Sequence, residues 1–208
     1  MKKEILERIE ALGGNIDQMK GNSFEEDWQS ITFDCVLYGD SFAENIWGIF
    51  EFCDKNWDVY LTDEKAFFEK MLNEYYYLAL KEEGRAYGQL FFTKNRFTPF
   101  TIGTDDYNEW NSFFEETVDR NMINELTGED NPEFVQVFYS YGYPDHYFIS
   151  VNDSNQDNPT ILGTDHEEFF SEINDTDTLE ELLNSFLTQD EFLELVKESV
   201  EEYKMEKK

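Results

Sequence analysis

The sequence predicts an α+β protein, a single domain in which helices flank a central antiparallel sheet. Short runs of alternating apolar and polar residues, typical of strands, are joined by connections too short for helical crossovers. Longer runs with apolar residues three and four positions apart indicate amphipathic helices. No internal repeat or linker-like change in composition divides the 208 residues, so we expect one domain over residues 1–208.

The N-terminal part is predicted to begin with a helix over residues 4–12, which two glycines end. The apolar face of this helix consists of Ile5, Ile9 and Leu12. After a polar stretch, the alternation returns in three short runs at 31–38, 46–52 and 57–61. Because these runs follow one another closely, they predict an antiparallel meander.

The middle of the chain predicts two long helices with strands between them. The first helix is expected from Asp63 to Gly84, and the second from Asp105 to Gly128. Two strands are expected between them, at 89–93 and 97–102. Pro99 lies in the second of these strands, which favours an edge position or a bulge.

The C-terminal third predicts a hairpin, one more short strand and two consecutive helices. The hairpin strands are expected at 134–139 and 146–151, joined by a turn-rich connection, and the short strand at 159–162. Two capping boxes, Thr178 with Glu181 and Thr188 with Glu191, each precede a run of apolar residues at helical spacing. These boxes predict where the last two helices begin.

Charge excludes two classes of partner. With 16 Lys and Arg against 47 Asp and Glu, the formal net charge is −31. A chain this acidic cannot line a phosphate backbone or an anionic membrane with cations, so neither nucleic acid nor membrane is an expected partner. The N-terminus lacks an apolar signal region and no run is long enough to span a bilayer, which predicts a soluble, cytoplasmic protein. Cys35 and Cys53 are expected to be buried free thiols, not a disulfide.

The residues that could carry chemistry are few. The sequence holds two histidines and no G-x-S-x-G turn, phosphate loop or dinucleotide fingerprint. Phe170 replaces the second histidine of a zinc-protease helix, and the loop that begins at Asp153 lacks the glycine and the final glutamate of a calcium loop. Paired carboxylates are frequent, but each is explained as a solvated face. We therefore expect no catalytic residue, no cofactor and no metal.

The acidic surface and the aromatic residues predict a protein partner of basic charge. A strong negative field favours encounters with a cationic protein, and Tyr and Trp frequently anchor interfaces. Trp28 and the turn at 141–143 are the aromatic positions expected to be exposed. The residues predicted to bind a partner are Trp28, Tyr141, Tyr143, Asp153, Asp157, Asp165 and His166.

The segment Asn158-Pro-Thr-Ile-Leu-Gly-Thr-Asp-His-Glu-Glu-Phe-Phe-Ser-Glu-Ile173, with the apolar positions of 178–188, resembles the C-terminal part of the SUKH superfamily. The resemblance spans about 134–196. This superfamily contains bacterial immunity proteins and fungal regulators of cell-wall synthesis. The resemblance implies a central antiparallel sheet and a role in toxin binding without catalysis. Residues 1 to about 130 lack the Leu-Pro pair and Asn-Gly-Gly-like turn of the superfamily, so this half is expected to be divergent or enlarged.

Four functions are compatible with these observations. The first is a non-catalytic immunity protein that neutralises a basic toxin, such as a nuclease of a polymorphic toxin system. The second is a regulatory scaffold related to the cell-wall synthesis regulators. An enzyme acting on a cationic or sugar substrate and a DNA mimic are the third and fourth, and they have less support from the residues. The sequence favours the first.

Overall fold

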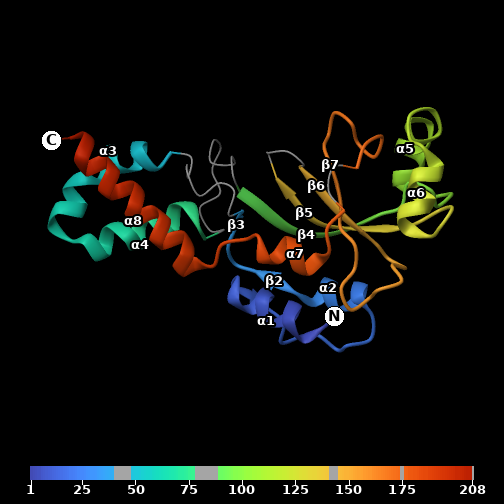
Figure 1. The fold of residues 1–208 in the computed structure, drawn as a ribbon, viewed down its shortest axis with the longest axis horizontal. Helices are drawn as coiled ribbons and strands as arrows, with labels where there is room; N and C mark the ends of the chain where they lie inside the picture. Colours follow the sequence, from blue (N-terminus) through green and yellow to red (C-terminus); the bar gives the residue numbers. More distant parts are fainter. Residues whose placement is uncertain (40–47, 78–88, 141–144, 174–175, 208) are drawn as a thin grey trace.

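A computed structural model describes residues 1–39, 48–77, 89–140, 145–173 and 176–207 (Figure 1). Their fold is mixed α+β, as predicted, with a five-stranded antiparallel sheet, a two-stranded sheet and eight helices in the described residues. The large sheet lies in the middle of the molecule. Helices α5 (Asp105–Glu116) and α6 (Arg120–Thr127) lie at one end, and α3 (Ile49–Thr62), α4 (Glu64–Tyr75) and α8 (Gln189–Glu206) lie at the other.

The large sheet follows the order of the chain, and every neighbouring pair of strands is antiparallel. Its strands are β3 (Leu37–Tyr38), β4 (Gln89–Phe97), β5 (Phe134–Ser140), β6 (His146–Ser150) and β7 (Leu162–Thr164). The two-stranded sheet pairs β1 (Gly14–Asn15) with β2 (Thr32–Phe33). The hairpin predicted near residues 134–151 is therefore the centre of the large sheet.

The remaining helices are α1 (Lys3–Ala11), α2 (Phe24–Ser30) and α7 (Leu179–Asn184), and α1 packs against α7. The predicted N-terminal helix is confirmed, since Ile5, Ile9 and Leu12 are fully buried. Both predicted capping boxes are also present, at the first turns of α7 and α8. Each box satisfies backbone N–H groups that a helix start leaves without an intrahelical acceptor.

The two faces of the large sheet bury separate apolar clusters. Along β6, Tyr147 and Ile149 join the larger cluster, whereas Phe148 between them joins the smaller one. This alternation follows from the two-residue period of a strand. Helices α1, α2, α7 and α8 contribute to the larger cluster. Helices α5 and α6 contribute to the smaller one.

A shift of register interrupts β5 between Gln136 and Phe138. Val137 and Phe138 are consecutive, yet both pack into the larger cluster. A β-bulge produces this effect because its extra residue lets two successive side chains face the same side. Before the shift, Phe134 faces the smaller cluster, and Gln136, two positions further on, lies on the same side.

The predicted strands at 46–52 and 57–61 are wrong for the residues that the structure describes. Residues 49–62 form the 14-residue helix α3, which begins after Gly48 in a left-handed conformation. Phe52, Cys53 and Asn56 are buried on one side of it, at spacings of three and four that the run of aromatic and β-branched residues conceals. Tertiary packing against α4 and α8 overrides the strand propensity of this segment.

Three other predicted boundaries also differ. A single strand, β4, replaces the two strands predicted at 89–93 and 97–102, and the chain turns at 98–102. The helix predicted from Asp105 to Gly128 is two helices, because Asp119 provides a new N-cap for α6 by accepting a hydrogen bond from the backbone N–H of Asn121 at 2.9 Å. Helix α4 ends at Tyr75, and the predicted end at Gly84 lies outside the described residues.

Other segments of the chain form hydrogen bonds with β3 at one edge of the large sheet and with the residue that precedes β7 at the other. Beside β3, the backbone N–H of Leu187 donates to the carbonyl oxygen of Tyr38 at 2.8 Å. Ahead of β7, the backbone N–H of Ile161 donates to the carbonyl oxygen of Asp177 at 2.7 Å. The backbone groups at these positions are therefore already hydrogen-bonded.

Both cysteines are buried free thiols, as predicted, and burial raises the pKa of Cys35 and of Cys53 to about 11. Such thiols are poor nucleophiles near neutral pH. Among the helices of the described residues, none combines the length and the apolar character needed to cross a membrane.

Candidate functional site

A cavity of about 290 Å³ opens on the face of the large sheet that carries the smaller apolar cluster. Four aromatic side chains contribute to its wall, namely Phe97, Trp110, Phe148 and Phe169. Polar and charged residues complete the lining, including Arg96, Asp106, Gln136 and both histidines of the chain, His146 and His166. We refer to this cavity as the aromatic pocket.

Regular structure positions most of the lining. Gln136 on β5 pairs directly with Phe148 on β6, and His146 lies two residues before Phe148, so both β6 side chains face the pocket. Asp106 and Trp110 lie four residues apart on α5 and therefore share one face of the helix. The pocket thus lies between the sheet and α5.

The segment after β7 supplies Phe169 through an uncommon backbone conformation. Phe170 has φ of 55°, in the left-handed region that residues other than glycine rarely adopt. Its side chain is fully buried in the smaller cluster, and its N–H donates to the hydroxyl of Thr164 at 2.9 Å. These contacts stabilise the backbone turn that places Phe169 next to Trp110. The two ring centroids are 4.8 Å apart.

Asp145 lies between the two histidines. His166 Nδ1–H donates to Asp145 Oδ2 at 2.6 Å, and His146 Nε2 lies 3.7 Å from Asp145 Oδ1. Gln136 Nε2 donates to His146 Nδ1 at 2.8 Å, which leaves the proton of a neutral His146 on Nε2, facing Asp145. Asp145 is buried and its Oδ1 has no hydrogen-bond partner among the described groups.

The two histidines differ in environment and therefore in pKa. Burial lowers the pKa of His146 below its ordinary value, and this effect exceeds the opposing attraction of Asp145. His166 is exposed, and its hydrogen bond to Asp145 raises its pKa. At a pH between the two pKa values, His146 is therefore neutral while His166 is protonated and positively charged.

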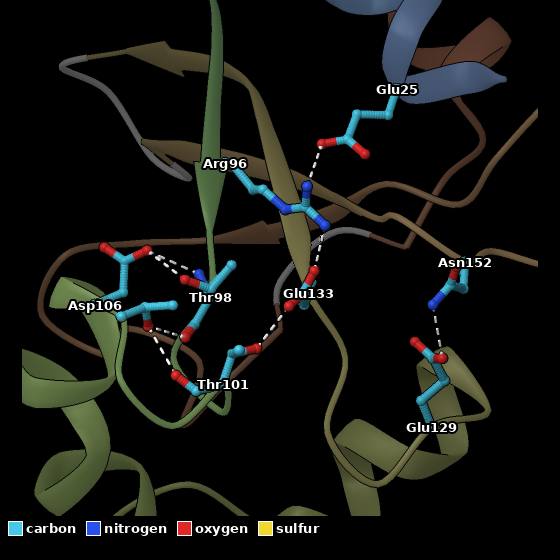
Figure 2. A network of polar contacts seen from close by, with 9 residues as sticks. Glu25, Arg96, Thr98, Thr101, Asp106, Glu129, Glu133 and Asn152 are labelled. Atoms are coloured by element: carbon cyan, nitrogen blue, oxygen red, sulfur yellow. Dashed lines mark hydrogen bonds and ion pairs between the residues drawn. The ribbon is translucent and has the colours of Figure 1, made fainter.

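Arg96 lies at one side of the pocket between two carboxylates, as Figure 2 shows. Its guanidinium is 3.2 Å from Glu25 Oε1 and also forms an ion pair with Glu133. Thr101 Oγ1 donates to Glu133 Oε1 at 2.6 Å, and this hydrogen bond, together with Arg96, lowers the pKa of Glu133. The positive charge of Arg96 is therefore neutralised within the molecule.

Asp106, which lines the pocket, uses one of its carboxylate oxygens to accept from Thr98 (Figure 2). The backbone N–H and the hydroxyl of Thr98 both donate to Asp106 Oδ2, at 2.9 and 3.0 Å. Asp106 Oδ1 makes no hydrogen bond with the described residues. The bonds from Thr98 fix the carboxylate while leaving one oxygen for a donor from outside.

The residues predicted to bind a partner fall in different places. His166 lines the pocket, and Asp165 beside it accepts hydrogen bonds from the backbone N–H of Glu167 and Glu168. Asp153 fixes its own loop, accepting from the N–H of Asn155 and of Thr160.

Asp157, also predicted to bind a partner, is exposed, with its carboxylate 3.7 Å from the N-terminal ammonium of Met1. Tyr141 and Tyr143 lie outside the described residues. Among the predicted partner residues that are described, His166 alone lines the pocket, and Asp165 is its neighbour in the chain.

The prediction that Trp28 is exposed is wrong. Trp28 is fully buried, and its ring centroid lies 5.1 Å from that of Phe92 and 5.7 Å from that of Phe138. Its Nε1–H donates to the carbonyl oxygen of Thr93 at 3.0 Å. Trp28 follows a polar stretch in the sequence, which is why the sequence predicts that it is exposed. In the structure, α2 directs its side chain toward the large sheet.

Sequence reasoning missed Arg96, Asp106 and Trp110 as members of a site. Trp110 has the spacing of a core residue on a helix, and Asp106 is typical of the acidic first turn of a helix. Both descriptions are correct locally, since Asp106 is in the first turn of α5 and Trp110 packs beside the smaller cluster. Only the packing of α5 on the sheet brings them next to Arg96 and the histidines.

Neither a metal-binding cluster in the described residues nor a similar known protein identifies this site. Within the described residues, no group of three or more His, Cys, Asp and Glu side chains could hold a metal ion. No protein-family model, curated protein or solved structure matches the chain. The fold and the site define an acidic α+β protein with an aromatic pocket at one face of its sheet.

Proposed function

We propose that this chain is a non-catalytic immunity protein that binds and neutralises a basic toxin domain, such as a nuclease. The face around the aromatic pocket is the proposed interface. Two sequence features support the proposal: the resemblance of about residues 134–196 to the SUKH superfamily, and a net charge of −31. Neutralisation by occlusion requires only binding, so no residue is assigned a catalytic role.

The observation that carries the proposal is how the chain uses its few cations. Among the described Lys and Arg side chains, Lys20, Lys55 and Lys197 alone make no ion pair or hydrogen bond. The others are bound to carboxylates or carbonyl oxygens of the same molecule, as Lys94 is to the carbonyl oxygen of Gln29. The carboxylates outnumber these cations, and we infer that a basic partner binds the excess negative charge.

The geometry beside the pocket fits an interface with an anchor and a polar rim. A second, polar hollow shares Arg96 with the aromatic pocket and is lined by Glu25 and Glu26. Glu167 and Glu168 are exposed, and in the sequence they lie between the lining residues His166 and Phe169. Aromatic anchors surrounded by polar groups are typical of interfaces in which a few residues supply most of the binding energy.

Co-expression with the toxin encoded beside this gene tests the proposal. We expect the cells to survive and the two chains to co-purify as a stoichiometric complex. Association should slow as salt screens the attraction between the acidic protein and the basic toxin, with a steered rate about 10- to 10³-fold above the unsteered one at low salt.

Two variants localise the interface on the acidic protein. Glu26→Lys, in the polar hollow, should slow association with the toxin, whereas Glu198→Lys on the distant face of α8 should slow it less. Survival of the cells without a physical complex would contradict the binding model. It would favour an enzyme that protects the toxin's target.

A further inference from the structure

The size of the aromatic pocket limits what it can hold. Pockets for drug-sized ligands and cofactors occupy about 300–1,000 Å³. The aromatic pocket, at about 290 Å³, lies at the lower limit of that range. Its volume suits a single side chain of a partner better than a nucleotide or another large cofactor.

The charged groups of the pocket favour a cation over an anion. Arg96 is paired with Glu25 and Glu133, and His166 is paired with Asp145, so neither positive group is left for an anionic ligand. Asp106 has one oxygen without a partner in the described chain. The net charge of −31 adds a long-range potential of the same sign.

The aromatic walls add a preference for a flat cation. The ring centroids of Trp110 and Phe169 lie 4.8 Å apart and those of Phe97 and Phe148 lie 5.5 Å apart, both pairs tilted, and all four rings belong to residues that line the cavity. A guanidinium stacks on aromatic faces and is weakly hydrated, whereas an ammonium is a compact, strongly hydrated charge. The chain uses such a contact itself, with the Arg120 guanidinium 3.8 Å from the centroid of the Phe100 ring.

We propose that the aromatic pocket is a binding site for an arginine side chain, which the basic partner inserts as its anchor. The guanidinium lies against Trp110 and Phe169 and donates to Asp106 Oδ1. This inference rests on the proposed function for the identity of the partner. The chemistry of the site, a guanidinium between aromatic rings and a carboxylate, follows from the pocket alone.

The two histidines make a direct test possible without the toxin. Both line the pocket and the chain contains no others, so their ring-proton NMR signals report on this site. We would titrate the wild-type protein at fixed pH with N-acetyl-arginine amide, its lysine counterpart and its neutral citrulline counterpart. The arginine compound should shift both signals saturably, with roughly tenfold weaker binding of the lysine compound. The citrulline compound should leave the signals in place.

Variants of the pocket test the anchor in the complex. Asp106→Asn, which can still accept from Thr98, and Trp110→Leu should each raise the dissociation rate of the toxin roughly tenfold and change association little. Glu198→Gln on α8 is the matched control and should change neither rate. Asp106→Asn keeps the size of the side chain, so it remains informative where Trp110→Leu fails to fold.

The outcomes separate this inference from the proposed function. If the toxin binds but the arginine compound moves neither histidine signal and both pocket variants dissociate like the wild type, the arginine site is wrong and the immunity function stands. If no toxin complex forms, the immunity function is wrong, and the titration alone decides the site. Equal or stronger binding of the lysine or citrulline compound overturns the guanidinium assignment.

Discussion

Asp145 favours the protonated form of both histidines, yet the pKa values of the two histidines shift in opposite directions. It accepts a hydrogen bond from His166, which is exposed and gains a proton more readily as a result. For His146, burial lowers the pKa by more than the attraction of the same carboxylate raises it. Asp145 and His166 are 21 positions apart in the sequence, which hides this arrangement from any local pattern.

The two histidines should titrate on either side of about 6.5, the ordinary value for histidine. We expect the NMR titration midpoint of His166 above this value and that of His146 below it. Asp145→Asn should bring the midpoint of His166 down, because the ion pair that favours its protonated form is lost. The ion pair should stabilise the folded protein below about pH 6.5, and this contribution should disappear as the pH rises through the higher folded-state pKa of His166.

Equal midpoints for the two histidines would contradict this account. So would a His166 midpoint that Asp145→Asn leaves in place. Asp157→Asn is a matched control, because Asp157 is exposed and contacts the N-terminus instead of a histidine. It should not move either midpoint.

Trp28 should be a determinant of stability and not of partner binding. Its ring packs against Phe24, Phe92 and Phe138 in the larger cluster. Trp28→Ala should lower the free energy of unfolding by about 3–5 kcal/mol, measured by urea denaturation, because it leaves a cavity in a packed core. Trp28→Phe should cost less, mainly the hydrogen bond to Thr93. An unchanged urea midpoint for Trp28→Ala would show that this region is not part of the cooperative core.

At the scale of elements, the helix starts at the two capping boxes were predictable from the sequence, whereas the starts of α3 and α6 were not. Thr188 accepts from the backbone N–H of Glu191, and the Glu191 side chain accepts from the N–H of Thr188. The backbone N–H and the hydroxyl of Thr188 both donate to the Glu191 carboxylate and hold its pKa below the ordinary value. Such capping depends on residues three positions apart, which is why the sequence alone locates it.

Removal of this cap should destabilise the protein by a measurable amount. Thr188→Ala is expected to lower the free energy of unfolding by about 0.5–2 kcal/mol in urea denaturation. Thr188→Ser keeps the hydroxyl and should recover most of the loss. Thr176→Ala, at an exposed threonine that caps no helix, is the control. Equal effects of the substitutions at 188 and 176 would show that the capping box contributes nothing.

Where prediction failed, the deciding contacts are distant in sequence. Helix α3 was predicted as strands because Ile49, Phe50, Phe52 and the residues around Trp57 have strand propensity. Their helical conformation depends on α4 and α8, and α8 begins more than a hundred residues later. The aromatic pocket escaped prediction for the same reason, since its wall combines β4, β5, β6, α5 and the segment after β7. The hairpin and the C-terminal helices, by contrast, depend on local patterns.

At the scale of the whole molecule, net charge should govern the response of stability to salt. Excess carboxylates repel one another in the compact state, and the ion pairs of the described residues are mostly at the surface, where each contributes little. Raising NaCl from about 0.01 M to about 0.1 M shortens the Debye length from about 30 to about 10 Å. The melting temperature should therefore rise in calorimetry over this range.

Substituting KCl for NaCl should give the same increase in melting temperature, because screening does not depend on the identity of the monovalent cation. A fall in melting temperature over this range would show that attractive pairs outweigh repulsion. An increase with only one of the two salts would indicate a specific ion site.

The segments that hydrogen-bond beside β3 and ahead of β7 have a consequence for the behaviour of the protein at high concentration. Open strand edges are templates on which a second chain can add a strand, and this addition starts domain swapping and fibril growth. Here the backbone of Leu187 is hydrogen-bonded to that of Tyr38 on β3, and the backbone of Asp177 is hydrogen-bonded to that of Ile161, just ahead of β7. A partner that recruits this sheet by strand addition would have to displace these segments first. We therefore expect strand addition to be disfavoured at Tyr38 and just ahead of β7, where the backbone groups are already hydrogen-bonded.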